Sequence, residues 1–270
     1  MRKYLVIVIL VISLSFTHSY AQMACNERLG SVSRETYTSN ILGRTMYYTV
    51  YLPPCYQQTD EAYPVIYLMH GSNDDDGQWE RLYLSHWMNV GIRDGVIAPA
   101  IVIMPFGDFI ANETRFDAYS WPQVFIDELM PTAEARYRIM DNKAYRAIGG
   151  ISRGGFWAYY IAMKYPDLFS VVGGHSAFFD MGQLPPENDP RALVQTEERL
   201  ETMRFFLDRG AGDYAAPGLD LMSERMLQRG LNLQYTVYPE GEHQNAYWRA
   251  HVAEYLALYT QDWPKQPTYV

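Results

Sequence analysis

The sequence predicts an α/β fold in which a mostly parallel central sheet has helices on both faces. Short apolar segments of strand length alternate with longer segments of helical periodicity along most of the chain. The 270 residues, 48% of them hydrophobic, are enough to bury the core of one such domain. A glycine-rich segment, residues 150–155, separates a strand-like run from a helix-like run. Ligands of such sheets bind beyond the carboxyl ends of the strands, where this segment is expected to lie.

The expected elements follow one another in a regular order. Strands are predicted near Thr36 and over residues 47–52, 65–69, 101–104, 145–149, 171–174, 203–208 and 233–237. Between most of them the spacing of apolar residues predicts helices, notably over residues 124–137, 156–165 and 246–259. Strands that alternate with helices in this way pair in parallel. The longest gap, residues 178–202, is expected to form either a cap that contacts substrate or a structural surface loop.

The first 21 residues have the pattern of a signal peptide. Arg2 and Lys3 precede an apolar run of about a dozen residues, which is too short to span a bilayer. Small residues at the cleavage-determining positions predict a mature chain that starts at Gln22 and forms one domain over residues 22–270. We therefore expect a secreted or periplasmic protein without a membrane span. A lipoprotein acylated at Cys25 is the alternative, although Gln22 and Met23 fit that pattern poorly.

The net charge indicates which partners are not expected, and the cysteine content predicts a disulfide. The formal net charge is −9 and becomes −11 without the leader, so binding to nucleic acid or anionic lipid is not expected. Cys25 and Cys55 are the two cysteines of the chain, and export predicts that they pair in a disulfide.

No cofactor or metal is expected from the sequence. The acidic run at residues 74–76 lacks the ligand spacing of a calcium loop, and a solvated loop beside the active site is the favoured interpretation. No cluster of histidine and cysteine indicates zinc, and no glycine-rich phosphate loop is present.

The segment Gly150-Ile151-Ser152-Arg153-Gly154 has the G-x-S-x-G pattern of a nucleophile elbow. In such a turn the serine is raised above the sheet edge, and the residues two before and two after it must be small. A serine hydroxyl is a weak nucleophile, so the pattern also predicts a histidine base and an acid that orients it, in the order Ser, Asp or Glu, His.

His243 is the predicted base, because it follows the last expected strand and precedes the last expected helix. The other histidines lie in the leader, at the ends of earlier strands or within helix-like segments: His18, His70, His86, His175 and His251.

The acid is expected just after the strand at residues 203–208. Asp213 follows a flexible glycine-containing loop that can carry a carboxylate to an imidazole, and it is favoured over Asp208 at the strand end. Asp220, within the next helix-like stretch, is a weaker candidate.

A second loop is expected to help stabilise the oxyanion. The strand at residues 65–69 runs into His70-Gly71-Ser72, where the glycine permits a sharp turn. The backbone N–H groups of Ser72 and Arg153 are the predicted donors, each commonly worth about 3 kcal/mol.

From about residue 39 to residue 263 the chain resembles the esterase family of α/β-hydrolases, which includes feruloyl and acetyl-xylan esterases, S-formylglutathione hydrolases, siderophore esterases and mycolyltransferases. The motifs that carry the resemblance are at residues 51–54, 68–71, 149–155, 173–176, 207–213 and 241–243, with Trp79 and Trp248. The resemblance implies the α/β-hydrolase fold. It also implies Ser152 as nucleophile, Asp213 as acid and His243 as base, with Ser72 and Arg153 as oxyanion donors. The chain departs from the family pattern at Cys55, where glycine is usual, and at Gln244, where many members have aspartate.

The expected activity is that of an exported serine carboxylic ester hydrolase that forms an acyl-enzyme on Ser152. Trp79, Phe178 and Trp248 are the predicted substrate-binding residues, with Trp121 and Phe179 nearby, and they suit a phenolic acyl group or a sugar. Small-molecule or carbohydrate esters, such as acetyl or hydroxycinnamoyl esters, are the expected partners. Acyl transfer to an acceptor other than water and a non-catalytic carbohydrate-binding or partner-binding role are the alternatives.

Overall fold

An eight-stranded sheet runs through residues 25–265, the part of the chain that the computed structural model describes. The strands lie in the order β1-β2-β4-β3-β5-β6-β7-β8. β1 and β2 pair antiparallel, as do β2 and β4, and every other pair is parallel. The strands are β1 (Ser31–Ser39), β2 (Arg44–Leu52), β3 (Val65–Met69), β4 (Ile101–Pro105), β5 (Arg146–Ile151), β6 (Val171–His175), β7 (Arg204–Gly210) and β8 (Asn232–Tyr238).

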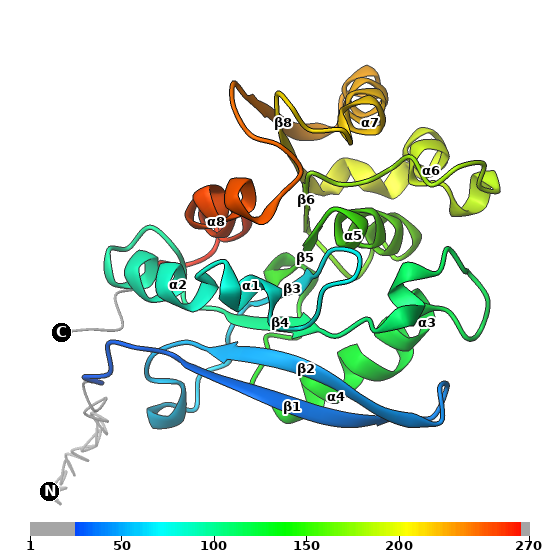
Figure 1. The fold of residues 1–270 in the computed structure, drawn as a ribbon. Helices are drawn as coiled ribbons and strands as arrows, with labels where there is room; N and C mark the ends of the chain where they lie inside the picture. Colours follow the sequence, from blue (N-terminus) through cyan, green and yellow to red (C-terminus); the bar gives the residue numbers. More distant parts are fainter. Residues whose placement is uncertain (1–24, 266–270) are drawn as a thin grey trace, which may run out of the picture.

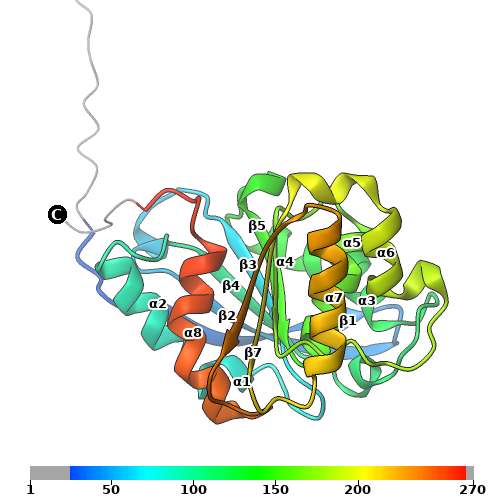
Figure 2. The same ribbon diagram turned by 90° about the horizontal axis from the view of Figure 1, so that it is seen from above.

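Helices cover both faces of the sheet (Figure 1), and the view from above shows the sheet between the two helical layers (Figure 2). One face carries α1 (Gln78–Arg81), α2 (Leu84–Arg93) and α8 (Asn245–Tyr259). The other carries α3 (Trp121–Val124), α4 (Met130–Arg136), α5 (Arg153–Lys164), α6 (Pro190–Thr196) and α7 (Ala216–Gln228). The predicted mostly parallel sheet with helices on both faces is therefore confirmed.

The side chains of β3 show why the central strands are apolar throughout. Ile66 and Leu68 pack into the core under α1, α2 and α8, whereas Val65, Tyr67 and Met69 pack into the core under α3 to α7. Successive residues of a strand point to opposite faces, so a strand that is covered on both faces must be apolar at every position.

The helix expected over residues 124–137 is longer and less regular than predicted. It begins at Trp121 and passes through a π-helical turn, Phe125–Leu129, before it continues as α4. Pro131 at the start of α4 has no N–H to donate to the preceding turn, which accounts for a local departure from α-helical bonding there.

Most of the segment at residues 178–202 packs on the helical layer. It contains α6, which contacts α5 and α7. Arg229 of the α7 C-terminus donates to the carbonyls of Val194 and Glu197 at 2.6 and 2.8 Å, and Lys164 donates to the carbonyl of Glu187 at 2.9 Å. Most of this segment is thus docked structure, and its first residue, Phe178, is the part that lies at the site described below.

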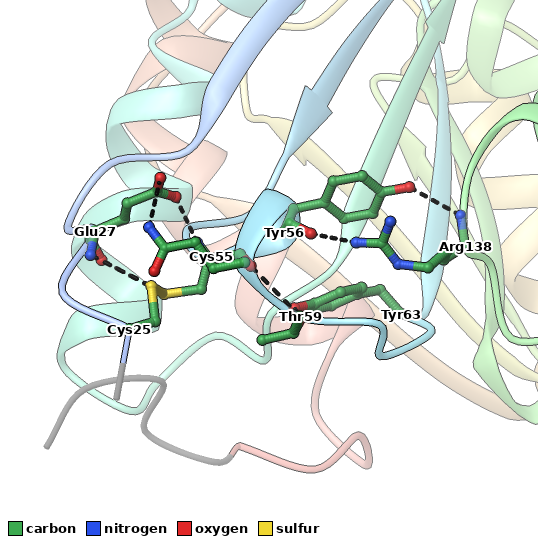
Figure 3. Close-up of a disulfide and its surroundings, with 8 residues drawn as sticks. Cys25, Glu27, Cys55, Tyr56, Thr59, Tyr63 and Arg138 are labelled. Carbon is green, nitrogen blue, oxygen red and sulfur yellow. Dashed lines mark hydrogen bonds between the residues drawn. A yellow bond between two sulfur atoms is a disulfide. The ribbon is translucent and has the colours of Figure 1, made fainter. Parts of the chain in front are cut away.

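A disulfide joins Cys25 to Cys55, with their Cα atoms 5.7 Å apart (Figure 3), as predicted. The Glu27 carboxylate accepts hydrogen bonds from the Cys55 N–H and from the Gln58 side chain, both at 2.9 Å. The start of the described chain is therefore fixed to the turn after β2, and a disulfide at Cys25 leaves no thiol there for acylation. The predicted leader, residues 1–21, lies outside the described residues. Within residues 25–265, no helix has the length and apolar character needed to cross a bilayer.

Candidate active site

Ser152 occupies the turn between β5 and α5. It has φ 54° and ψ −119°, a backbone conformation that is strained for a residue other than glycine. A Cβ built on Gly150 would lie 2.4 Å from the carbonyl carbon of Gly154, and one built on Gly154 would lie 2.4 Å from the carbonyl oxygen of His70. These two glycines therefore allow the strand, the helix and the β3 loop to meet at Ser152, as the elbow pattern predicts.

Helix α5 begins at Arg153, three residues before the expected start of the helix at residue 156. The two glycines of its first turn are weak helix formers, which explains the late predicted start. Close packing of the first turn on β5 and β3 outweighs that preference. As a result, the unpaired N–H groups of the first helical turn follow directly after Ser152.

Three side chains from distant parts of the chain form one hydrogen-bonded series. His243 Nε2 lies 2.7 Å from Ser152 Oγ, and His243 Nδ1 lies 2.9 Å from Asp213 Oδ1. An ionised carboxylate can only accept, so Nδ1 carries the hydrogen and Nε2 is left to accept from the serine hydroxyl. This is the arrangement that turns a serine hydroxyl into a nucleophile.

Asp213 follows β7 in a tight turn that positions its carboxylate. Its Oδ1 also accepts from the N–H of Ala215 at 2.8 Å. Burial would raise the pKa of Asp213, but hydrogen bonds from His243, Ser176 and the Ala215 N–H outweigh it and hold the pKa below its usual value. The carboxylate is thus ionised at neutral pH, opposite the Nδ1–H of His243.

Asp208, the competing candidate, lies elsewhere. Its carboxylate is buried and is 2.6 Å from Nδ1 of His175, and it accepts from the hydroxyls of Tyr247 and Tyr255 at 2.6 and 2.8 Å. Asp220, the third candidate, contacts Arg209 on β7. Of the three aspartates, Asp213 is the one that the structure brings to His243.

The sequence reasoning missed a row of tyrosines behind the site. Tyr247, Tyr255 and Tyr259 lie on one face of α8, and Tyr259 is hydrogen-bonded to His175 Nε2 at 2.9 Å. With His251 between them, these residues recur every four positions, which is a helical period that the sequence contains.

The loop that follows β3 also lies next to Ser152. A Cβ on Gly71 would lie 3.6 Å from the Ser152 Cβ. The N–H of Gly71 donates to Gln78 Oε1 at 2.8 Å, and its carbonyl is 2.7 Å from Nδ1 of His70. His70 Nε2 in turn accepts from the N–H of Gly107 at 2.9 Å, and burial lowers the pKa of His70. This loop is therefore fixed by a neutral, buried histidine.

A cleft of about 340 Å³ opens over Ser152. Ser72 and Arg153, the predicted oxyanion donors, both line it. Its other lining residues are Gly71, Asn73, Asp74, Gln78, Ser152, Phe178, Tyr214, His243, Asn245 and Trp248. The cleft thus has one largely aromatic part and one polar part beside the serine.

The predicted aromatic residues differ in where they lie. Phe178 and Trp248 line the cleft, and the indole of Trp248 stands edge-on to His243 with ring centroids 5.1 Å apart. Trp79, in contrast, is 1% exposed and packs in the core, where its Nε1 donates to the carbonyl of Met69. The turn into α1 directs the Trp79 indole inward, so its prediction as a substrate-binding residue is not met. Trp121 and Phe179 are also buried.

Tyr214 is a cleft residue that the sequence reasoning missed. Its side chain is exposed, and its ring lies 4.2 Å from the His243 ring and 6.0 Å from the Phe178 ring, between centroids. Its position directly after Asp213 is the signal that could have identified it.

The acidic run at residues 74–76 is not simply a solvated loop, as had been expected. Asp76 is 3% exposed and binds Arg34 through two hydrogen bonds of 2.7 and 3.0 Å, with a third from Thr49 at 2.9 Å. A buried carboxylate requires such partners, and the edge strand β1 and its neighbour β2 supply them. Asp74 and Asp75 pair with Arg81.

Comparison with known proteins places the chain in a family. The family model "Putative esterase" matches residues 39–259. Over 232 residues the chain is 29% identical to an endo-1,4-beta-xylanase/feruloyl esterase from Xylanibacter ruminicola, a match that covers 82% of this chain and 30% of that relative. The chain thus corresponds to less than a third of the length of this curated relative.

Solved structures show the same fold. A ferulic acid esterase superimposes with a TM-score of 0.79 at 26% identity, covering 86% of this chain and 99% of the other. An S-formylglutathione hydrolase from Staphylococcus aureus superimposes with a TM-score of 0.74 at 18% identity, covering 86% and 99%. The family match and the shared fold, together with the elbow at Ser152, establish that the chain belongs to the esterase family of α/β-hydrolases.

Proposed function

We propose that the protein is a serine esterase that hydrolyses carboxylic esters through an acyl-enzyme on Ser152. The observation that carries this proposal is the series Ser152–His243–Asp213, with contacts of 2.7 and 2.9 Å at the floor of an open cleft. Family membership and the names of the relatives support it.

In the proposed reaction, His243 Nε2 takes the proton of Ser152 as Oγ attacks the ester carbonyl. Asp213 holds the imidazole in the required tautomer and stabilises the imidazolium that forms. His243 then gives the proton to the leaving alcohol, and an acyl-enzyme remains on Oγ. A water molecule, deprotonated by His243, attacks this ester, and His243 then returns the proton to Ser152 Oγ as the acid is released.

The oxyanion of each tetrahedral intermediate is assigned to the backbone N–H groups of Ser72 and Arg153. Both residues line the cleft at Ser152. Arg153 is the first residue of α5, where helix N–H groups lack intrahelical partners. Each such donor is commonly worth about 3 kcal/mol in the transition state.

The proposed substrates are esters with an aromatic acyl group or a carbohydrate alcohol. Phe178, Tyr214 and Trp248 offer ring surface in the cleft, and Asn73, Gln78 and Asn245 offer hydrogen-bonding groups. A relative named as a xylanase/feruloyl esterase supports this class of substrate.

The leader pattern supports export, which would bring the enzyme to extracellular esters. N-terminal sequencing of the secreted protein would test for a start at Gln22.

The test is covalent trapping combined with turnover. The protein should hydrolyse a short-chain nitrophenyl ester. A fluorophosphonate should stop turnover by phosphonylating Ser152 with loss of fluoride, so the peptide that contains Ser152 should gain the mass of the phosphonyl group. Product analysis with competing alcohols present would separate hydrolysis from acyl transfer. Absence of turnover, or labelling at another residue with loss of activity, would contradict the proposal.

A further inference from the structure

The carboxylate of Asp213 has one oxygen whose hydrogen bonding is incomplete. Oδ1 accepts from His243 and from the Ala215 N–H, as described above. Oδ2 is buried and has no partner at hydrogen-bonding distance and angle within the described chain. Leaving a buried oxygen without a hydrogen-bond donor is unfavourable, and more so when the oxygen is charged. A donor for Oδ2 is therefore expected close by.

Ser176 is the side chain placed to be that donor. It follows the end of β6, is fully buried, and lies near enough to Asp213 for its hydroxyl to help lower the pKa of that carboxyl. The Nε1–H of Trp248 donates to Ser176 Oγ at 2.9 Å. Because an indole N–H can only donate, Ser176 Oγ must accept this bond, and the hydroxyl hydrogen remains free to point at Oδ2.

The backbone at Ser176 supports a specific role for its side chain. Ser176 has φ 50°, in the left-handed region that glycine adopts without strain. Its N–H donates to the carbonyl of Asp208 at 2.9 Å, which fixes this conformation. A glycine would meet the backbone requirement at lower cost, so the conformation alone does not account for a serine here.

We propose that Ser176 is a positioning residue for the hydrolytic reaction. Trp248 orients the Ser176 hydroxyl, and that hydroxyl donates to Oδ2 of Asp213. The carboxylate is then held at both oxygens and cannot rotate away from Nδ1 of His243. The functional series becomes Trp248–Ser176–Asp213–His243–Ser152, in which Ser176 acts through Asp213. This inference rests on the proposed serine-esterase function.

The decisive variant is Ser176→Gly, which removes the hydroxyl and is compatible with the positive φ. We expect kcat to fall about tenfold while KM changes less than about twofold, since Ser176 does not line the cleft. The acid limb of the pH profile of kcat/KM should move down by about half a pH unit. Without the serine hydroxyl, the Asp213 carboxylate can rotate away from Nδ1 of His243 and stabilises the imidazolium less.

Two further variants complete the experiment. Trp248→Phe keeps a ring beside His243 but removes the N–H, so it should shift the acid limb in the same direction by a smaller amount. Ser223→Ala is the matched control, because Ser223 is a buried serine on α7 whose hydroxyl donates to the carbonyl of Asp220 at 2.8 Å, away from the cleft. It should leave kcat and the pH profile unchanged.

A merely structural role for Ser176 would lower the melting temperature without moving the acid limb. A folded Ser176→Gly variant with wild-type kcat and pH profile would overturn the inference about Ser176. If Ser152→Ala is inactive in the same assay, the proposed serine-esterase function still holds. If Ser152→Ala is active, both the inference and the proposed function are wrong. If Ser176→Gly fails to fold, the pH profile of Trp248→Phe decides, and an unshifted limb counts against the inference.

Discussion

The backbone N–H of Ser152 donates to the carbonyl of His175 at 2.9 Å. The turn that carries the serine is thereby held to the end of the neighbouring strand, β6. The side chain of His175 is in turn held by Asp208 and Tyr259. The strained turn at Ser152 therefore rests on a buried polar network that is distinct from the series proposed to carry out the reaction.

The two aspartates at the end of β7 should respond differently to the same substitution. Asp213→Asn should lower kcat by about 10²- to 10⁴-fold with little loss of stability, because the amide no longer enforces the tautomer of His243. Asp208→Asn should chiefly lower the free energy of unfolding, by roughly 1.5–3 kcal/mol, since three donors lose a charged acceptor. Steady-state kinetics and urea unfolding of both variants measure this, and the opposite pattern would assign the acid to Asp208.

The aromatic part of the cleft should determine acyl preference. Phe178→Ala and Tyr214→Ala should each lower kcat/KM for feruloyl esters about two- to tenfold more than for acetyl esters, because a ring contact is worth about 0.5–1.5 kcal/mol. Tyr83, an exposed tyrosine that does not line the cleft, provides the control variant Tyr83→Ala. Equal losses for both kinds of ester would mean that these rings do not contact the acyl group.

His70 should make stability depend on pH. Its pKa is lowered by burial, so the folded state binds fewer protons than the unfolded state just below pH 6.5. The stability that neutral His70 contributes is complete above about pH 6.5 and is lost as the pH falls toward its folded pKa. His70→Asn should therefore be less stable than the wild type at pH 8, by roughly 1–3 kcal/mol, and this gap should narrow at pH 5. If urea unfolding gives the same difference in stability between the two proteins at pH 8 and at pH 5, the role assigned to neutral His70 is wrong.

The disulfide should contribute to stability and not to turnover. Cys25 and Cys55 are 30 residues apart, and closing such a loop stabilises the folded state by roughly 3–4 kcal/mol. Cys25→Ser should lower the denaturant midpoint accordingly while kcat at 25 °C stays within about twofold. Thiol titration of denatured protein should find no free thiol before reduction and two after it. Two free thiols before reduction would exclude the bond.

Much of this architecture follows from local sequence patterns. The central strands were predictable because both faces of the sheet are covered there, which makes these strands continuous apolar runs. Ser152 and His243 were identifiable because each follows a strand at a turn. Asp213 was preferred over Asp208 because a loop, and not a strand, can carry its carboxylate across to an imidazole.

The remaining features depend on contacts between distant segments. Asp76 is buried because Arg34, on the edge strand β1, reaches it, and no local pattern shows this. Trp79 was assigned to the cleft from its place after the β3 loop, but the direction of its indole depends on how α1 packs. Ser176 has a potential role only through its contacts with Trp248 and Asp213, 72 and 37 residues further along the chain.

The nucleophile is the central claim, and its most direct test is the kinetics of Ser152→Ala, His243→Ala and the double variant on a nitrophenyl ester. Each single variant should lose on the order of 10⁴-fold or more in kcat with an unchanged near-ultraviolet circular dichroism spectrum, and the double variant should be hardly worse, because the two residues act as one unit. Retention of more than about a tenth of wild-type activity by Ser152→Ala would contradict the account.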